Sequence, residues 1–276
     1  SIAIQRALSH IKASALAAQY LSGVEYIQFV KDLLDHFDER KDELVRSLQE
    51  VREILADQSR LSMAGGSTQQ NRETLLECME SFKKALPKRQ VTGERENHFV
   101  PEKCNEGLIT PGQVQYVVQE GIFDVPYTGV MRVARQILGL EYLWNRLRVQ
   151  GGAYGAFADF SPLGILYMAS YRDPNLASTL ETYAQVADYL EHFQSSPEEL
   201  EKYVIGTIGE LDTPLTPALR ITVGNSRARI GQTAQRLQQT RDQVLGTTVE
   251  QIQEIATAVR QAMSTSCICT VGSKEA

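Results

Sequence analysis

Arg148-Val149-Gln150-Gly151-Gly152-Ala153-Tyr154-Gly155 is the stretch at which a helical sequence pattern changes to a strand pattern. Before it, apolar residues from Val130 to Trp144 recur every three or four positions, which predicts a helix over residues 128–147 with one buried stripe. After it, alternating residues predict a β-hairpin that turns near Ser161-Pro162. The return strand would carry Ile165, Tyr167 and Ala169 on one face. The sequence therefore predicts a helix followed directly by two paired strands.

The same stretch carries side chains that are suited to chemistry. The guanidinium of Arg148 can donate two hydrogen bonds to carbonyl or carboxylate oxygens. The phenol of Tyr154 can donate to an oxygen that becomes negatively charged during a reaction. Gly151 and Gly152 would let the backbone approach another chain closely. The spacing leaves an alternative open, a glycine-containing strand start in which Tyr154 is packed and Arg148 pairs with an acid.

Strand and helix patterns alternate on both sides of this stretch. Further strands are expected at residues 60–64, 114–119 and 267–271, and residues 87–112 are expected to form a long loop. Further helices are expected over residues 71–86, after Asp173-Pro174, after Ser196-Pro197, over residues 225–244, and from a Thr247/Glu250 capping box through Val259. This order predicts an α+β fold with one mixed, largely antiparallel sheet that helices cover.

The first part of the chain has a helical pattern. Residues 2–21 and residues from about 27 to 55 each predict an amphipathic helix, and together they predict a helical hairpin. We therefore expect residues 1–57 to be the tail of a preceding domain or a linker, and residues 58–276 to be an α+β domain. Because Ser1 already lies in a helical pattern, we also expect the chain to be a piece of a longer polypeptide.

Composition excludes several classes of protein. Hydrophobic residues make up 42% and charged residues 22%, which is typical of a globular protein. The formal net charge of -6 gives no basic surface of the kind that binds nucleic acid. No apolar run approaches the roughly 20 residues that cross a membrane. We expect a soluble protein without nucleic-acid or membrane partners.

The cysteines and histidines do not predict a metal site. Cys78, Cys104, Cys267 and Cys269 match neither a disulfide framework nor a paired zinc motif, so we expect reduced thiols and a reducing compartment, cytoplasm or an organelle matrix. No two histidines lie within five residues of each other, so no helical pair can hold zinc. The sequence also lacks a nucleophile elbow and a phosphate loop. It therefore shows no complete catalytic apparatus and no metal ligands.

Four segments resemble one family in the same order. Residues 148–155 resemble the Arg-Val-x-Gly-Gly-Ala-Tyr-Gly segment of presequence proteases, a subgroup of the insulinase-like (pitrilysin-clan) zinc metallopeptidases. Residues 170–175 resemble their Ser-Tyr-Arg-Asp-Pro-Asn stretch, and residues 205–212 are similar to their Ile-Gly-Thr-Ile-Gly-Asp-x-Asp run. Residues 22–26 are similar to Ser-Gly-Ile-x-Tyr. One departure is Gln150, where related proteins commonly have Lys; it leaves the Arg and the Tyr in place.

The resemblance implies an architecture and partners. Members of the family contain four related α+β domains, in two halves that close around an unfolded peptide. Zinc is bound in the N-terminal half by an inverted His-x-x-Glu-His motif and a distal Glu, and this chain contains neither motif. The chain would correspond to the C-terminal portion, with the helical hairpin before it. Its partners would be the zinc-bearing N-terminal half of the same polypeptide and a peptide substrate.

The resemblance also implies roles for individual residues. Arg148 would hold a backbone carbonyl of the substrate, and Tyr154 would donate to the oxyanion formed during peptide-bond hydrolysis. Gly151 and Gly152 would shape the strand beside the peptide. The expected function is the substrate-binding part of a zinc metalloendopeptidase that degrades short unfolded peptides, inactive in isolation. The alternatives are a non-catalytic subunit of the same fold, for assembly or peptide binding, and an unrelated helical scaffold without a central sheet.

Overall fold

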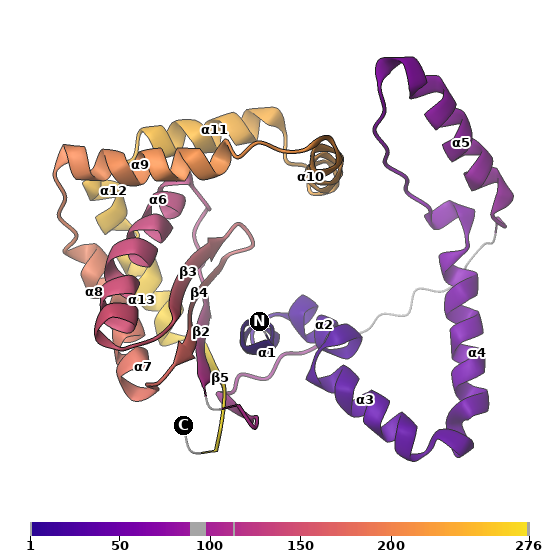
Figure 1. Ribbon diagram of the computed structural model, residues 1–276, viewed down its shortest axis with the longest axis horizontal. Coiled ribbons are helices and arrows are strands. Elements are labelled where there is room, and N and C mark those ends of the chain that lie inside the picture. The colour runs from indigo at the N-terminus through magenta and orange to yellow at the C-terminus, as the bar shows by residue number, and fades with distance from the viewer. Residues whose placement is uncertain (1, 89–97, 113, 275–276) are drawn as a thin grey trace. The chain divides into compact units, whose positions relative to one another are not determined.

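The computed structural model describes residues 2–88, 98–112 and 114–274, which belong to two compact units (Figure 1). Unit 1 comprises Ser1–Ile27, His98–Thr213 and Gln235–Ala276, and unit 2 comprises Gln28–Asn97 and Pro214–Ala234. The predicted division at residues 57 and 58 stays a prediction, because these units report contacts within the chain rather than domains of a longer protein.

A single mixed sheet organises the described part of unit 1. Its five strands lie in the order β1-β5-β2-β4-β3, and only β1 and β5 pair in parallel. The strands are β1 (Glu106–Ile109), β2 (Gln115–Ile122), β3 (Gly155–Ser161), β4 (Ile165–Asp173) and β5 (Cys267–Gly272). The predicted α+β fold with a mixed, largely antiparallel sheet is confirmed, and a helical scaffold without a sheet is excluded.

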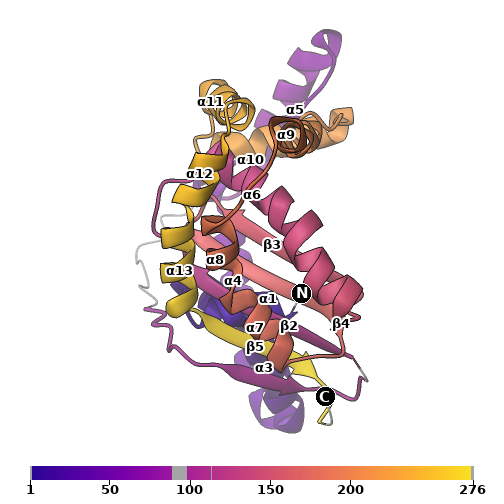
Figure 2. The ribbon, with the colours of Figure 1, turned by 90° about the vertical axis from the view of Figure 1, so that its left-hand side faces the viewer.

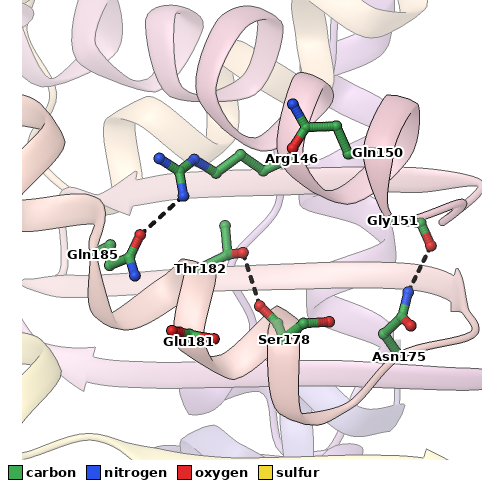
Figure 3. A pocket seen from close by; sticks show the side chains of 8 residues that line it. All are labelled: Arg146, Gln150, Gly151, Asn175, Ser178, Glu181, Thr182 and Gln185. Carbon is green, nitrogen blue, oxygen red and sulfur yellow. Dashed lines mark hydrogen bonds between the residues drawn. The ribbon is translucent and has the colours of Figure 1, made fainter.

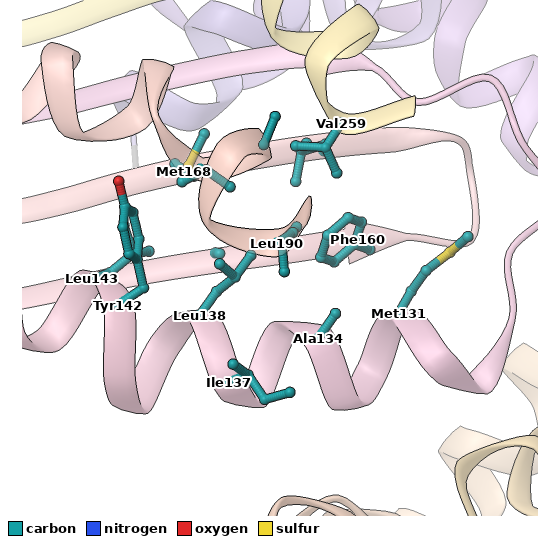
Figure 4. Packing of buried hydrophobic residues seen from close by; sticks show 14 of the residues in the cluster. Met131, Ala134, Ile137, Leu138, Tyr142, Leu143, Phe160, Met168, Leu190 and Val259 are labelled. Atoms are coloured by element: carbon teal, nitrogen blue, oxygen red, sulfur yellow. The ribbon is translucent and has the colours of Figure 1, made fainter. Parts of the chain in front are cut away.

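Helices cover one face of this sheet (Figure 2). They are α6 (Gly129–Ile137), α7 (Ala177–Ala184), α8 (Val186–Glu191), α12 (Val249–Glu254) and α13 (Ala256–Ser264). The main hydrophobic core lies between these helices and the strands, and Figure 4 shows part of it. Leu138, Leu143 and Leu190 are fully buried there. This core fixes the helix-to-hairpin segment in which the candidate site lies.

A short helix packs on the opposite face of the sheet. α1 (Ile2–Ser9) contacts β2 and β5, and its buried Ala3 and Ala7 allow a close approach. Arg6 ties this helix to the sheet through an ion pair with Glu106 of β1. α1 covers the β5 and β2 side of this face, so side chains of β3 and β4 on the same face remain accessible, as the 53% exposure of Phe157 shows.

The remaining elements are helical. They are α2 (Ala13–Ser22), α3 (Val24–Asp35), α4 (Phe37–Leu55), α5 (Arg72–Ala85), α9 (Pro197–Leu211), α10 (Pro217–Arg229) and α11 (Ala234–Leu245), with 3₁₀ turns at Gln58–Arg60 and Gln69–Asn71. Within the described residues, none of these or the other helices has the length and apolar character to cross a membrane. The two long N-terminal helices of the prediction are each divided, at residues 10–12 and at His36.

Several predicted elements differ from the structure. The strand at residues 60–64 is wrong, because a short alternating run found no partner strand and residues 61–68 have no regular structure. The single helix over residues 225–244 is wrong, because Gly231 adopts a φ of +65° and separates α10 from α11. The predicted loop over residues 87–112 contains β1, and its residues 89–97 lie outside the described part.

The helix starts were predicted with mixed success. The capping box at Ser196 is present and opens α9. The second capping box lies one residue later than predicted, at Thr248 and Gln251. Asp173-Pro174 does not itself begin a helix, since α7 begins at Ala177. Its carboxylate is used instead to fix the loop before that helix, as described below.

Candidate functional site

The candidate site lies where α6 ends and β3 begins. Past Ile137 the helix continues as two π-helical segments, η3 (Leu138–Tyr142) and η4 (Trp144–Gln150). π-helical turns are rare and often occur at functional sites. They shift the helical face, so Trp144 is 39% exposed rather than part of the predicted buried stripe. The end of η4 thus presents its side chains on the surface.

The two glycines are required by the turn that follows η4. The Gly152 N–H donates to the Arg148 carbonyl at 3.1 Å, and the Ala153 N–H donates to the Leu147 carbonyl at 2.8 Å. Gly152 has a φ of +79°, a conformation that glycine adopts readily. A Cβ on Gly151 would lie 2.7 Å from the carbonyl oxygen of Leu147. Both glycines therefore let the chain reverse directly into Tyr154.

Tyr154 is fixed through its backbone and exposed through its ring. Its N–H donates to the carbonyl of Tyr171 at 3.0 Å, which ties it to the end of β4. Its side chain is 62% exposed. The ring centre lies 5.6 Å from that of Tyr171, which in turn contacts Tyr116 at 5.2 Å in an edge-on arrangement. The phenol has no hydrogen-bond acceptor among the described residues, so its O–H is available to a ligand.

Arg148 lies beside Tyr154 on the surface. Its guanidinium carbon is 4.0 Å from the centre of the Trp144 ring and 5.7 Å from that of Tyr154. Cation–π contacts of this kind orient a guanidinium without using its N–H groups. Within the described part of the chain, no carboxylate forms an ion pair with Arg148. The alternative of a packed tyrosine and an acid-paired arginine therefore does not hold.

Sequence reasoning did not assign roles to three neighbours of this pair. They are Trp144, whose ring contacts Arg148, and Tyr171 and Arg172, whose ring and guanidinium group contact Tyr154. Tyr171 and Arg172 belong to the Ser-Tyr-Arg-Asp-Pro-Asn segment, which could have pointed to them. Their position beside Tyr154 follows only from the pairing of β3 with β4, in which Gly155 lies opposite Tyr171.

A buried carboxylate holds the two halves of the site together. Asp173 is 1% exposed and accepts hydrogen bonds from the Asn175 N–H at 2.9 Å and the Thr179 hydroxyl at 2.7 Å. The Asn175 side-chain amide then donates to the Gly151 carbonyl at 2.6 Å (Figure 3). The end of β4 is thereby linked to the glycine turn, which fixes the position of Tyr154 relative to Arg172.

A polar hollow borders the glycine turn (Figure 3). Its volume is about 400 Å³. It is lined by Arg146, Gln150, Gly151, Asn175, Ser178, Glu181, Thr182 and Gln185. The Arg146 guanidinium donates to the Gln185 side-chain carbonyl across it at 2.9 Å. This hollow shares Gly151 and Asn175 with the site, and its lining favours polar rather than apolar ligands.

The described residues do not provide a site that fits zinc. They contain no group of three or more His, Cys, Asp or Glu side chains that could hold a metal ion. His10 hydrogen-bonds to Glu106 and contacts the thiol of Cys104. All four cysteines are free thiols.

The carboxyl group of Glu120, outside the site, has a strongly raised pKa. Glu120 on β2 is 1% exposed, and burial raises its pKa to about 8. It lies between Tyr167 of β4 and Cys267 of β5 in the sheet register, and burial also raises the pKa of both neighbours. Among the described residues, no positive charge compensates Glu120, and its buried Oε2 has no hydrogen-bond partner.

Comparisons with known proteins agree on one family. The family model described as the PreP C-terminal domain matches residues 105–274. Protein HypA of Clostridium perfringens is 31% identical over 277 residues, which cover 99% of this chain and 28% of that protein. Presequence protease 1, chloroplastic/mitochondrial, of Arabidopsis thaliana is 29% identical over 278 residues, covering 99% and 26%. The chain thus spans about a quarter of the length of these relatives.

Solved structures show the same fold. A peptidase M16 inactive domain from Pseudomonas fluorescens superposes with a TM-score of 0.53 at 20% identity, covering 74% of this chain and 51% of that one. A protease from Helicobacter pylori superposes with a TM-score of 0.56 at 14% identity, covering 76% and 53%. At these identities the likeness concerns the fold.

Proposed function

Because the chain belongs to the family of PreP C-terminal domains, we propose that it is the substrate-holding part of a zinc metalloendopeptidase that degrades short unfolded peptides. The observation that carries this proposal is the pairing of Arg148 and Tyr154. Both side chains are exposed and lie beside each other. Among the described residues, no carboxylate forms an ion pair with the Arg148 guanidinium, and no group accepts a hydrogen bond from the Tyr154 hydroxyl. An N–H fork and a phenol O–H are hydrogen-bond donors that could bind the carbonyl oxygens of a peptide backbone.

The geometry suggests how each group acts. The Arg148 guanidinium donates hydrogen bonds to a backbone carbonyl of the bound peptide, while its contact with Trp144 keeps it in place. The Tyr154 phenol donates to the carbonyl oxygen of the scissile peptide bond, which becomes negatively charged when a nucleophile adds to the carbonyl carbon, before the C–N bond breaks. Gly151 and Gly152 form the turn that presents both side chains beside the peptide strand.

The metal belongs to another part of the proposed enzyme. Since the described residues do not fit zinc, we propose that zinc is bound by an N-terminal half of the same polypeptide, and that this half and the peptide substrate are the partners of the chain. The greater length of the relatives supports this assignment. The chain in isolation is then inactive.

The compartment and the domain division are proposed on the same basis. The relatives from Arabidopsis thaliana and Saccharomyces cerevisiae carry the words chloroplastic/mitochondrial and mitochondrial in their names. We place this protein in an organelle matrix or the cytoplasm, where its free thiols remain reduced. Within it, residues 1–57 form the connecting segment and residues 58–276 the metallopeptidase-like domain.

A complementation experiment tests the proposal. The purified chain, supplied with zinc and an unfolded peptide, is expected to hydrolyse nothing and to bind no stoichiometric zinc. Adding the zinc-bearing half should produce peptide cleavage that requires both parts. Zinc-dependent cleavage by the chain alone would contradict the proposal. If cleavage is absent from the full-length protein as well, the chain is instead a non-catalytic subunit for assembly or peptide binding.

A further inference from the structure

Arg172 has a backbone conformation that requires an explanation. Its φ is +49°, which makes it the one non-glycine residue of the described chain in the left-handed region. Such a conformation costs on the order of 1–2 kcal/mol for a residue with a Cβ. Residues held in this region cluster at functional sites, where the surrounding structure imposes the conformation. Here the buried network of Asp173 imposes it.

The same residue forms a β-bulge. In the pairing of β2 with β4, Gln115 lies opposite Asp173 and Tyr116 lies opposite Tyr171, so Arg172 has no partner on β2. In a regular strand, consecutive side chains point to opposite faces. A bulge redirects a side chain, and bulges are common beside active sites. Here the guanidinium of Arg172 instead lies 5.4 Å from the ring of its own neighbour, Tyr171.

The redirected guanidinium joins the candidate site. Its carbon lies 5.8 Å from the centre of the Tyr154 ring, which also contacts Arg148 at 5.7 Å. Two exposed guanidinium groups therefore contact the Tyr154 ring. The ion pairs of the described residues use other arginines, namely Arg6, Arg40, Arg135, Arg241 and Arg260. Two guanidinium groups without a described carboxylate partner form a site for an anion.

We propose that Arg172 is a specificity-determining residue that binds a carboxylate of the peptide substrate next to Tyr154. This inference rests on the proposed function. Arg148 holds a backbone carbonyl, and Arg172 adds a planar fork that matches a carboxylate with two parallel hydrogen bonds. The aromatic rings of Tyr154 and Tyr171 contact the guanidinium and leave its N–H groups free. The carboxylate comes either from the C-terminus of a peptide or from an Asp or Glu side chain.

The test measures binding of four related peptides to the full-length protein after zinc removal, by fluorescence anisotropy. Two peptides share one sequence and differ only in a free or amidated C-terminus. Two more are amidated and differ only in Glu or Gln at one interior position. In one of the two pairs, the one that carries the recognised carboxylate, we expect the carboxylate form to bind about tenfold more tightly than its neutral counterpart, as one charge-assisted pair implies.

The variants separate the guanidinium from the backbone conformation. Arg172→Gly removes the side chain and adopts a positive φ without strain, so it is expected to abolish the carboxylate preference while binding the neutral peptides within about twofold of the parent. Arg172→Lys keeps the charge but not the fork, and should retain a small part of the preference. The pair of peptides that loses its preference identifies the source of the carboxylate.

One result overturns the inference. If Arg172→Gly binds all four peptides with the same relative affinities as the parent, Arg172 does not recognise a carboxylate. Zinc-loaded protein then provides the separate check on the proposed function, since Tyr154→Phe should slow peptide cleavage whatever the behaviour of Arg172. If Arg172→Gly keeps the carboxylate preference and Tyr154→Phe cleaves peptides more slowly, the carboxylate site is refuted while the proposed function stands.

Discussion

The guanidinium carbon of Arg148 lies 5.7 Å from the ring centre of Tyr154, with both side chains on the surface of the protein. Arg148 lies near the end of the helical segment η4, and Tyr154 directly precedes the edge strand β3; the glycine turn between them brings the two residues together. Neither side chain belongs to the core, which explains why their arrangement depends on backbone hydrogen bonds and on Asp173. Four predictions can be measured: three concern this site, and the fourth concerns the buried Glu120 of β2.

Tyr154→Phe in the full-length enzyme is expected to lower turnover by about 100- to 1,000-fold, the usual effect of losing one oxyanion donor. The ring contacts with Tyr171 do not need the hydroxyl, so the thermal midpoint should be unchanged. Steady-state peptide cleavage gives the rate. Tyr26→Phe, at an exposed position on α3, serves as the control. Equal rates for the parent and the Tyr154→Phe enzyme would remove this phenol from the reaction.

Arg148→Ala is expected to reduce kcat/KM by about 10- to 100-fold, because a hydrogen bond from a charged donor contributes roughly 1.5–3 kcal/mol. Arg148→Lys should recover only part of this loss, since an ammonium cannot donate two parallel hydrogen bonds. Cleavage kinetics of the two variants in the full-length protein provide the comparison. Full recovery by lysine would show that charge alone is required.

Gly152→Ala is expected to destabilise the protein by about 1–2 kcal/mol, the cost of a Cβ at positive φ. The nearest atom to that Cβ would be Pro174 Cγ at 3.6 Å, so the effect arises from the backbone rather than from crowding. Denaturant unfolding measures the loss. Gly209→Ala on α9 is the matched control, because nothing lies within 4 Å of its Cβ and its φ is not positive. That control should be neutral or slightly stabilising.

Glu120→Gln is expected to stabilise the protein at alkaline pH. The folded pKa of about 8 lies above the ordinary value of 4.5, so the folded state holds a proton that the unfolded state releases, and stability falls as pH rises from 4.5 through 8. One pKa unit corresponds to about 1.4 kcal/mol, so the full loss above pH 8, for a pKa raised from 4.5 to about 8, is on the order of 5 kcal/mol. Glutamine is neutral at every pH and removes this loss.

Chemical denaturation at pH 5 and at pH 9 checks this prediction. The parent protein and Glu120→Gln should have similar stability at pH 5, where the buried carboxyl is protonated, and should differ clearly at pH 9. Glu198→Gln, at an exposed position on α9, is the control. Glu141→Gln is unsuitable because the Glu141 carboxylate accepts a hydrogen bond from the Tyr203 hydroxyl. A pH-independent difference between parent and Glu120→Gln would show that the carboxyl is not responsible.

The fold and the glycine turn beside the candidate site could be predicted because they leave local signals. The period of apolar residues changes at Gly151 and Gly152, and that change located both the turn and Tyr154. Arg172 could not be predicted as part of the site, because its side chain changes face only through a bulge that depends on pairing with β2. Trp144 was misplaced because π-helical segments shift the helical face by a fraction of a turn, which apolar periodicity does not reveal.

Long-range pairing explains the other errors. β1 was taken for loop because its four residues alternate weakly, and it is a strand only through its parallel partner β5. The opposite error occurred at residues 60–64, where an alternating run has no partner. Gly231 also shows that an isolated glycine in a polar helical pattern can mark a helix end, although the pattern continues on both sides.

The position of β5 affects how the protein is made. β5 lies between β1 and β2, with Glu106 paired to Cys269, yet the ribosome synthesises it after every other strand of the sheet. Until β5 emerges, the hydrogen-bonding groups along one edge of β2 are exposed in the nascent chain, and open strand edges promote aggregation. The sheet can therefore be completed only after β5 has been synthesised, although three of its other strands, β2, β4 and β3, can pair with one another before then.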